Sequence, residues 1–231
     1  MGREKLPMAA QRHQMACEET ESAGTRSRIL NAAGPVFADK GFRDATVRDI
    51  CQAASVNLAS VNYHFGDKQR LYIESVKEAH RRRFDQVPPP QWPVEARAED
   101  KLRLFIETFA MRLLGGEEDT WQTRLMMREI LQPTQACEEL VQDYFRPQFN
   151  ELLQILDEMV PASTSEARRH QMAFSIVGQC VYYRIAESVV RLLVGGDEYV
   201  EHYTATQLGE HIAGFSLAAL QNSSTVVDGI E

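Results

Sequence analysis

The sequence predicts an all-α protein made of a small N-terminal helical domain and a larger helical body. Apolar residues recur at helical spacing, and no stretch shows the alternation of a β-strand. Two short predicted helices meet at a tight turn near residue 56, and a proline-rich stretch, Gln86–Pro93, ends the helices that precede it. These observations predict about nine helices, arranged as a three-helix head, a connecting helix from Asp67 and a body from about Pro93.

The first helix is expected over Thr25–Lys40, with Gly41 as its C-terminal stop. Pro35 lies in its middle and lacks an N–H group, so we expect a kink there. Residues 1–24 carry no apolar segment of the kind found in a signal peptide, and we expect a flexible arm.

The strongest local signal runs from Thr46 to Tyr72. Thr46 and Asp49 have the spacing of a capping box, which begins a helix. A three-residue turn follows, and its last residue, Asn57, is a suitable N-cap for a second helix over Leu58–Phe65. The outward side chains of that helix can hydrogen-bond: Ser60, Asn62, Tyr63 and His64. This pattern predicts a helix-turn-helix motif, whose second helix enters the major groove of DNA.

The same stretch, TVRDICQAASVNLASVNYHFGDKQRLY, resembles the DNA-binding domain of the TetR family of transcriptional regulators. The resemblance covers about Thr25–Arg83 and implies an all-helical dimer with a ligand-binding C-terminal body. We expect Ser60, Asn62, Tyr63 and His64 to face the groove, and Thr25, Thr46, Arg48 and Lys68 to bind phosphates. Asn62 is the best candidate for reading adenine through two hydrogen bonds. In the family, the position of His64 often holds a packing aromatic residue, so packing is the alternative there.

The charge distribution is compatible with DNA binding, although the whole chain carries a net charge of −8. Residues 25–84 contain 11 basic and 6 acidic side chains, a net charge of +5, and the acidic excess lies after them. Binding to phosphate needs a basic face and not a basic protein, because salt screens exposed charges beyond about 8 Å. No run of about 18 apolar residues occurs, so we expect a cytoplasmic protein without a membrane partner.

Beyond the connecting helix, which is expected to end near Phe84, the chain reads as a linker, a helical body and a tail. The linker is expected over residues 85–97, the body over residues 98–222 and a loose tail over residues 223–231. Pro147 is expected to kink or divide the third body helix. The expected body helices cover residues 98–114, 120–131, 135–159, 165–194 and 199–221.

Two body segments, TWQTRLMMREILQP and SIVGQCVYYRIAESVVR, place arginines among aromatic and apolar side chains. Such a lining suits a small-molecule cavity, although arginine stems that merely cover the core are the alternative. Both segments resemble the YbiH/CecR-like branch of the TetR family, which implies effector sensing. Because guanidinium groups pair with carboxylates, they favour an anionic or aromatic effector. The predicted effector-binding residues are Trp121, Arg124, Arg128, Tyr144, Phe145, Gln179, Tyr182 and Arg184.

The body is also expected to form a homodimer, because one short recognition helix reads only a few base pairs. Gly178 and Gly214 would permit close approach of helices from two copies. An intramolecular core is the alternative for about half of the candidate positions. The candidate interface residues are Val177, Val181, Val189 and Leu192 on the long helix, and Ile212, Phe215 and Leu220 on the last.

The motifs of common enzymes are missing from the sequence, which has no nucleophile elbow, phosphate-binding glycine loop or His-Glu-x-x-His pair. We therefore expect no enzymatic activity, no cofactor and no metal site. The function predicted is a transcriptional regulator, a repressor that binds a palindromic operator of double-stranded DNA as a dimer and is released by a small-molecule effector. The alternative is a helical binding or scaffold module that never contacts DNA.

Overall fold

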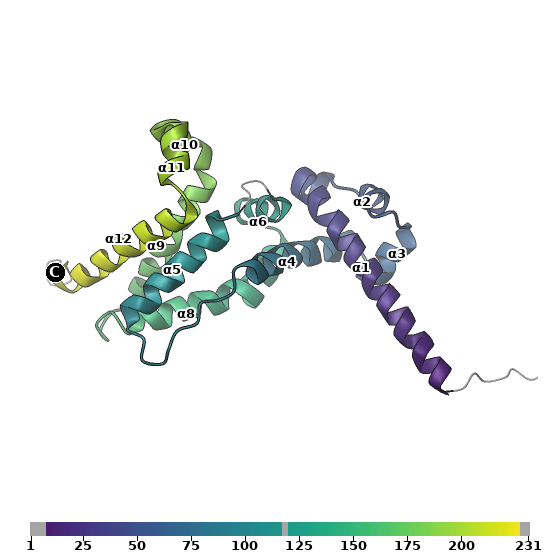
Figure 1. The fold of residues 1–231 in the computed structure, drawn as a ribbon, viewed down its shortest axis with the longest axis horizontal. Helices are drawn as coiled ribbons and strands as arrows, with labels where there is room; N and C mark the ends of the chain where they lie inside the picture. The colour runs from purple at the N-terminus through teal and green to yellow at the C-terminus, as the bar shows by residue number, and fades with distance from the viewer. Residues whose placement is uncertain (1–7, 117–119, 227–231) are drawn as a thin grey trace, which may run out of the picture.

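The computed structural model describes residues 8–116 and 120–226, and within these ranges the chain forms only helices and connecting loops (Figure 1). The predicted all-α fold is confirmed, and the described residues form more helices than the sequence indicated. The elements are α1 (Met8–Asp44), α2 (Val47–Ala54), α3 (Leu58–Phe65), α4 (Lys68–Gln86), α5 (Ala98–Leu114), α6 (Trp121–Leu131), α7 (Gln135–Leu140), the π-helical turn η1 (Val141–Phe145), α8 (Arg146–Asp157), α9 (Glu166–Ile185), α10 (Glu187–Val194), α11 (Gly196–His202) and α12 (Ala205–Val226).

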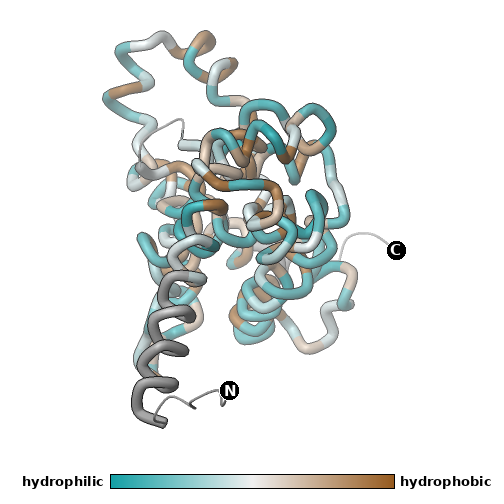
Figure 2. Tube along the Cα trace, turned by 90° about the vertical axis from the view of Figure 1, so that its right-hand side faces the viewer, coloured by the Kyte–Doolittle hydropathy of each residue, from teal (hydrophilic) through white to brown (hydrophobic). Residues whose placement is uncertain are grey.

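Figure 1 shows α1, α2 and α3 at one end of the molecule and the body helices α5, α8, α9 and α12 at the other. Helix α4 runs from the first group toward the second, and α6 lies beside both α1 and α4. Helices α10 and α11 project from one end of the body. In Figure 2, hydrophilic and hydrophobic residues are interspersed along the helices, as expected where each helix buries one side.

Helix α1 begins at Met8, so the expectation that residues 8–24 form a flexible arm is wrong. Residues 8–23 contain no glycine or proline and are rich in alanine, glutamine and glutamate, which favour the helix. The remaining residues of the expected arm, 1–7, lie outside the described part of the chain. The expected stop at Gly41 is present as a break in helical geometry, with φ 77° and ψ 174°.

The predicted kink at Pro35 is absent from the dihedral angles, because Gly41 is the residue of α1 that leaves the helical region. The neighbouring residue, Gly34, lies where α1 contacts Trp121 of α6. A Cβ atom at Gly34 would lie 2.3 Å from the ring of Trp121, so only glycine lets α6 pack this closely against α1.

The third expected body helix is divided next to Pro147, as predicted. The helix over residues 135–159 is interrupted by the π-helical turn η1, and Pro147 lies in the first turn of α8. Proline is tolerated there because the first N–H groups of a helix have no partner within it.

Two other expected body helices are wrong as continuous elements. The helix over 165–194 breaks at Ala186, whose φ of −97° and ψ of 15° separate α9 from α10. The helix over 199–221 divides before Thr204, which forms hydrogen bonds in both directions with Gln207 as in a capping box. The expected loose tail over residues 223–231 is wrong for residues 223–226, which belong to α12, and its remaining residues lie outside the described part of the chain.

The described residues form two hydrophobic cores, and α4 contributes five buried residues to the first. This core joins α1–α4 to Leu125 of α6 and to Ala136 and Leu140 of α7. The second core packs α5, α8, α9 and α12 around Leu102, Leu152 and other apolar residues. The first core therefore continues past the linker that follows α4 into the body segment of the chain.

A buried carboxyl group holds α4, α6 and α7 together at this junction. Glu129 is 0% exposed, and its Oε2 accepts a hydrogen bond of 2.7 Å from the Tyr72 hydroxyl. Its Oε1 accepts bonds from the Thr134 backbone N–H at 2.6 Å and from the Thr134 hydroxyl at 2.8 Å. Burial and the adjacent carboxyl group raise the pKa of Tyr72, whose ring also packs on Phe37 and Phe42.

Replacing the buried carboxyl group is expected to destabilise the protein strongly. Glu129→Leu leaves the Tyr72 hydroxyl and the Thr134 N–H group buried without an acceptor, which costs roughly 2–5 kcal/mol. The control Glu158→Leu removes an exposed partner of Lys101 and should cost less than about 1 kcal/mol. Urea denaturation at one fixed protein concentration measures both variants. Equal destabilisation by the two changes would contradict this role of Glu129.

Candidate nucleic-acid interface and ligand cavity

Helix α2 begins at the predicted capping box. The Thr46 hydroxyl accepts a hydrogen bond from the Asp49 N–H, and the Asp49 carboxylate accepts one from the Thr46 N–H, both at 3.1 Å. Hydrogen bonds from Lys40 and Thr46 lower the pKa of Asp49 to about 2. The start of α2 is therefore tied to the end of α1, with Arg48 exposed beside it.

The turn between α2 and α3 has the geometry of a helix-turn-helix motif. Ser55 adopts the left-handed conformation with φ 53°, and the Asn57 side chain accepts a hydrogen bond of 2.8 Å from the Ser60 N–H. Val61 and Phe65 of α3 are buried in the core that α3 shares with α1, α2 and α4. The opposite face of α3 is consequently directed away from the core.

Of the four predicted groove residues, Asn62 and Tyr63 are the most accessible. Both are exposed on α3, Tyr63 at 80%. The Ser60 hydroxyl is already bonded to Asn57, and the ring of His64 is half-buried, with an edge contact to Tyr63. Asn62 is therefore exposed on the outward face of α3, as its predicted role requires, and His64 has packing contacts.

The four predicted phosphate-binding residues have different surroundings. Thr46 and Arg48 are exposed at the start of α2, while Thr25 is half-buried on α1. Lys68 donates a hydrogen bond of 3.1 Å to the Arg43 carbonyl and lies 4.8 Å from the centre of the Phe42 ring. The Lys68 ammonium group therefore also fastens the start of α4 to the end of α1.

A cavity of about 520 Å³ lies among α4, α5, α6, η1, α8 and α9. Phenylalanine, methionine, leucine and valine side chains form most of its lining. Cavities of roughly 300–1,000 Å³ with such linings bind small molecules in many proteins. The wall contributed by α4 consists of Ala79, His80, Arg83 and Phe84.

Most of the predicted effector-binding residues lie outside this cavity, and Phe145 is the member of that set within its described lining. Trp121 packs on Gly34, Arg124 pairs with Asp39 at 2.7 Å, and Arg128 donates to the Ala38 and Asp39 carbonyls. These side chains therefore fasten α6 to α1, which was the alternative reading of the arginines.

The other predicted effector residues are spread over three further environments. Tyr144 packs on His80, and Gln179 donates to the Ser175 carbonyl and the Ser216 hydroxyl. Tyr182 is 53% exposed, and Arg184 pairs with Glu187 at 3.2 Å.

The sequence reasoning missed the cavity-lining polar residues His80, Arg83 and Arg112. They lie on α4 and α5, whereas the predicted effector-binding residues all come from residues 121–145 and 179–184. The signal available was the position of Arg112 among Met111, Leu113 and Leu114 near the C-terminus of α5. Arg83 donates hydrogen bonds to the Met111 and Gly115 carbonyls at the C-terminus of α5, so α4 and α5 are joined beside the cavity.

Family comparisons agree with this arrangement. A model described as "Bacterial regulatory proteins, tetR family" matches residues 29–74, which include α2 and α3. A second, described as "HTH-type transcriptional dual regulator CecR, C-terminal domain", matches residues 98–220, more than half of the chain. The protein belongs to the TetR family. The resemblance of residues 29–74 to the TetR DNA-binding domain is confirmed. The resemblance of the body to the CecR-like branch is also confirmed.

Three similar proteins illustrate how far the likeness extends. The regulator UidR of Escherichia coli K12 is 30% identical over 102 residues, 43% of this chain and 52% of UidR, so the match spans about half of that relative. The dual regulator CecR of Shigella flexneri is 21% identical over 78% of this chain and 84% of CecR. A TetR-like regulator from Rhodococcus sp. RHA1 has the same fold, with a TM-score of 0.55 and 20% identity over 84% of this chain and 96% of that one.

The residues predicted to form the dimer of this TetR-family protein divide into buried and exposed groups. Val177 and Val181 line the cavity, and Ile212 and Leu220 belong to the second core. The exposed members are Val189 at 52%, Leu192 at 85% and Phe215 at 61%. The first four are therefore used within one chain, and the last three remain candidates for contact with a second copy.

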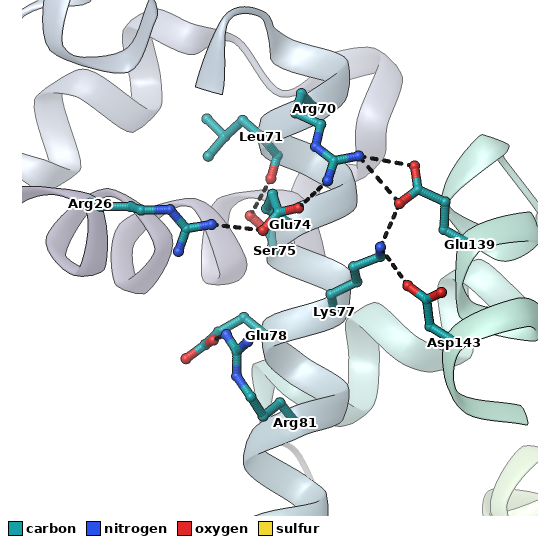
Figure 3. Close-up of polar contacts among 10 residues, drawn as sticks. All are labelled: Arg26, Arg70, Leu71, Glu74, Ser75, Lys77, Glu78, Arg81, Glu139 and Asp143. Atoms are coloured by element: carbon teal, nitrogen blue, oxygen red, sulfur yellow. Dashed lines mark hydrogen bonds and ion pairs between the residues drawn. The ribbon is translucent and has the colours of Figure 1, made fainter. Parts of the chain in front are cut away.

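A chain of ion pairs connects the cavity side of the molecule with the DNA-binding head (Figure 3). Lys77 of α4 pairs with Asp143 of η1 at 2.7 Å and with Glu139 of α7 at 2.5 Å. Glu139 also pairs with Arg70 at 3.1 Å. Burial lowers the pKa of Lys77, but the hydrogen bonds that its ammonium group donates to Asp143 and Glu139 outweigh this effect, and the net change is upward.

The same chain of ion pairs continues into the head. Arg70 pairs with Glu74 at 2.6 Å, and Glu74 pairs with Arg26 of α1 at 2.7 Å. The Arg26 guanidinium lies 5.2 Å from the centre of the Phe65 ring, at the end of α3. Contacts of charged side chains thus run from η1, next to the cavity, through α7, α4 and α1 to Phe65 of α3.

No helix in the described part of the chain is long and apolar enough to cross a membrane.

Removing the proposed base-reading amide is expected to weaken sequence-specific binding. Asn62→Ala should cost about 1–3 kcal/mol of affinity for the preferred duplex and should blur the preference for it, because a bidentate contact to adenine is lost. Fluorescence anisotropy with the preferred duplex and a scrambled one measures both effects. The matched control Asn150→Ala changes an exposed asparagine of α8 and should leave binding unaltered. Unchanged affinity and selectivity in Asn62→Ala would contradict the assignment.

Proposed function

We propose that this TetR-family protein is a dimeric repressor that binds a palindromic operator and releases it when a small molecule occupies the cavity. The observation that carries the proposal is the position of α4. Its first half packs in the core of the DNA-binding head, and residues 79–84 form a wall of the cavity. A ligand that displaces this wall therefore acts on the element that holds the head.

The ion-pair chain supplies a second connection between the cavity and the head. Val141 and Phe145 of η1 line the cavity, and Asp143 between them pairs with Lys77 of α4. A ligand that contacts η1 consequently also shifts the partner of Lys77. A π-helical turn is a suitable place for such a contact, because its hydrogen-bond pattern departs from that of the flanking helices and such turns recur at functional sites.

A small displacement is sufficient for release. In a dimer, the two recognition helices must reach half-sites about one helical turn of DNA apart, roughly 34 Å. A movement of either head away from this spacing weakens binding to both half-sites together. Coupling free energies of about 1–3 kcal/mol between two sites change affinity roughly 5- to 150-fold.

The proposed dimer uses the exposed apolar faces of α9 and α12. Tyr182 and Ile185 of α9 are 53% and 48% exposed, and Phe215 of α12 is 61% exposed. Exposed apolar side chains gathered on neighbouring helices are typical of association surfaces. A Cβ atom added at Gly178 or Gly214 would meet nothing within 4 Å, so the described chain leaves room there for a second copy.

Selection of bound duplexes from a random DNA library tests the regulator proposal. We expect enrichment of an inverted repeat, followed by its release when the protein is screened against small molecules. Failure to enrich any sequence would favour the alternative of a helical scaffold module. Enrichment with activation of a reporter gene by the unliganded protein would refute repression and leave DNA binding intact.

The dimer is expected to dissociate when a charge is placed on the proposed interface. Phe215→Asp would bury an unpaired carboxylate twice across a two-fold axis, which costs several kcal/mol. Sedimentation at micromolar concentration should show the unchanged protein as a dimer and the variant as a monomer. Val94→Asp is the matched control, because Val94 is 94% exposed in the linker. A dimer that persists in Phe215→Asp would place the interface elsewhere.

Breaking the ion-pair chain is expected to reduce effector-induced release. Lys77→Met removes the link from α4 to η1 and α7, and we expect the ratio of operator affinities without and with a releasing compound to fall by roughly 2- to 30-fold. Lys101→Met is the control, because Lys101 is equally shielded, at 13% against 15%, but pairs with Glu158 inside the body. Equal ratios in both variants would show that the ion pairs do not carry the coupling.

A further inference from the structure

We infer that the ligand of this cavity has an apolar, ring-containing body and one anionic group, and that Arg112 Nη2 and His80 Nδ1 bind the anionic group. The inference rests on the proposed function only in treating the ligand as the effector. It assigns the chemical class of the ligand and the atoms that select it.

The apolar part of the ligand follows from the lining. The rings of Phe84, Phe105, Phe109 and Phe149, together with Met126 and Met127, contribute to the cavity wall. Water in such a space finds few hydrogen-bond partners, so apolar surface is favoured there. Flat aromatic walls accept rings in offset or edge-on contact.

The anionic part of the ligand follows from two buried polar atoms, His80 Nδ1 and Arg112 Nη2. Neither has a hydrogen-bond partner among the described residues. The other contacts of Arg112 fix its side chain, because Nε donates to the Val87 carbonyl at 2.7 Å and Nη1 to Gln148 at 3.3 Å. A buried donor that lacks an acceptor is costly, and a ligand oxygen at this position would satisfy it.

The two atoms belong to one part of the cavity wall. The Arg112 guanidinium lies 3.8 Å from the centre of the Phe84 ring, and the His80 ring stacks on Phe84 with centres 4.6 Å apart. Both side chains therefore contact the same ring, and the proposal places the oxygen-bearing group of the ligand beside Phe84. The planar guanidinium suits a carboxylate or sulfonate better than a single hydroxyl group.

The charges of the cavity lining also favour an anion, and Glu151 of α8, a carboxylate whose charge acts on Arg112, lies outside that lining. The described lining contains three arginines and no aspartate or glutamate. Arg83 is occupied by the carbonyls at the end of α5, and Arg146 donates to Gln142, which leaves Arg112 with the unsatisfied donor. Burial, aided by the charge of Arg112, lowers the pKa of His80 to about 4, so its ring is neutral near pH 7. The proposal therefore requires the tautomer that carries its proton on Nδ1, which donates to the ligand oxygen.

Two fluorescent probes with the same rings test the inference directly. Anilinonaphthalene sulfonate carries an anionic group, and phenylnaphthylamine is its neutral analogue. We titrate each into the full-length protein without DNA and measure the dissociation constant from the fluorescence increase. We expect the sulfonate to bind at least about tenfold more tightly than the neutral probe.

Variants of the two polar residues show whether the preference arises at this wall. Arg112→Gln should weaken sulfonate binding roughly ten- to hundredfold and leave the neutral probe unchanged. His80→Phe keeps the stacking on Phe84, so it provides a second test if Arg112→Gln fails to fold by circular dichroism. We expect it to weaken sulfonate binding roughly two- to tenfold. Arg124→Gln is the control, because Arg124 pairs with Asp39 outside the described cavity lining.

The outcomes separate this inference from the proposed function. Equal affinity for both probes, or a preference that survives Arg112→Gln and His80→Phe, would overturn the anion assignment while operator binding and release remained intact. Loss of the preference in these variants, in a protein that enriches no DNA sequence, would support the anion site and refute the regulator proposal.

Discussion

The arrangement of head and body depends on the buried carboxyl group of Glu129. It accepts three hydrogen bonds, one from Tyr72 of α4 and two from Thr134, the N-cap residue of α7. A buried carboxyl group is stable only when its oxygens are satisfied, so the three helices must keep their relative positions. Because Tyr72 also packs on Phe37 and Phe42, this one group positions α1 as well. The DNA-binding head is thereby held on the body through α4, α6 and α7, and not by the linker that follows α4.

Helix α4 therefore belongs both to the core of the head and to the wall of the cavity, and a ligand in the cavity acts on both. Near its start, Leu71 and Tyr72 are locked in the core of the head, and at its end, His80 and Phe84 face the cavity. A rigid helix cannot move at one end without moving at the other. The ion pairs of Lys77 lie between these two regions and join α4 to η1 and α7. Packed cores respond to such displacement by switching between discrete arrangements, which is how small shifts become large changes in affinity.

The parts predicted correctly from the sequence are those decided by neighbouring residues. The capping box at Thr46, the N-cap at Asn57 and the end of helical geometry at Gly41 each depend on contacts within a few residues. The extension of α1 to Met8 also had a local signal, which is high helix propensity without glycine or proline over residues 8–23. The division before Thr204 carried a capping box with Gln207 that was overlooked.

The cavity residues had no comparable local signal, because the same residue type serves opposite purposes. Arg128 and Arg112 both stand among apolar residues in the sequence. The packing of α6 on α1 gives Arg128 the carbonyls of Ala38 and Asp39, whereas the space between α5 and α8 leaves Arg112 Nη2 without a partner. What makes an arginine selective for a ligand is the unmet hydrogen bond, which is a property of the assembled helices. A sequence pattern can therefore predict a cavity among the body helices, while only the packing of distant segments decides which guanidinium faces it.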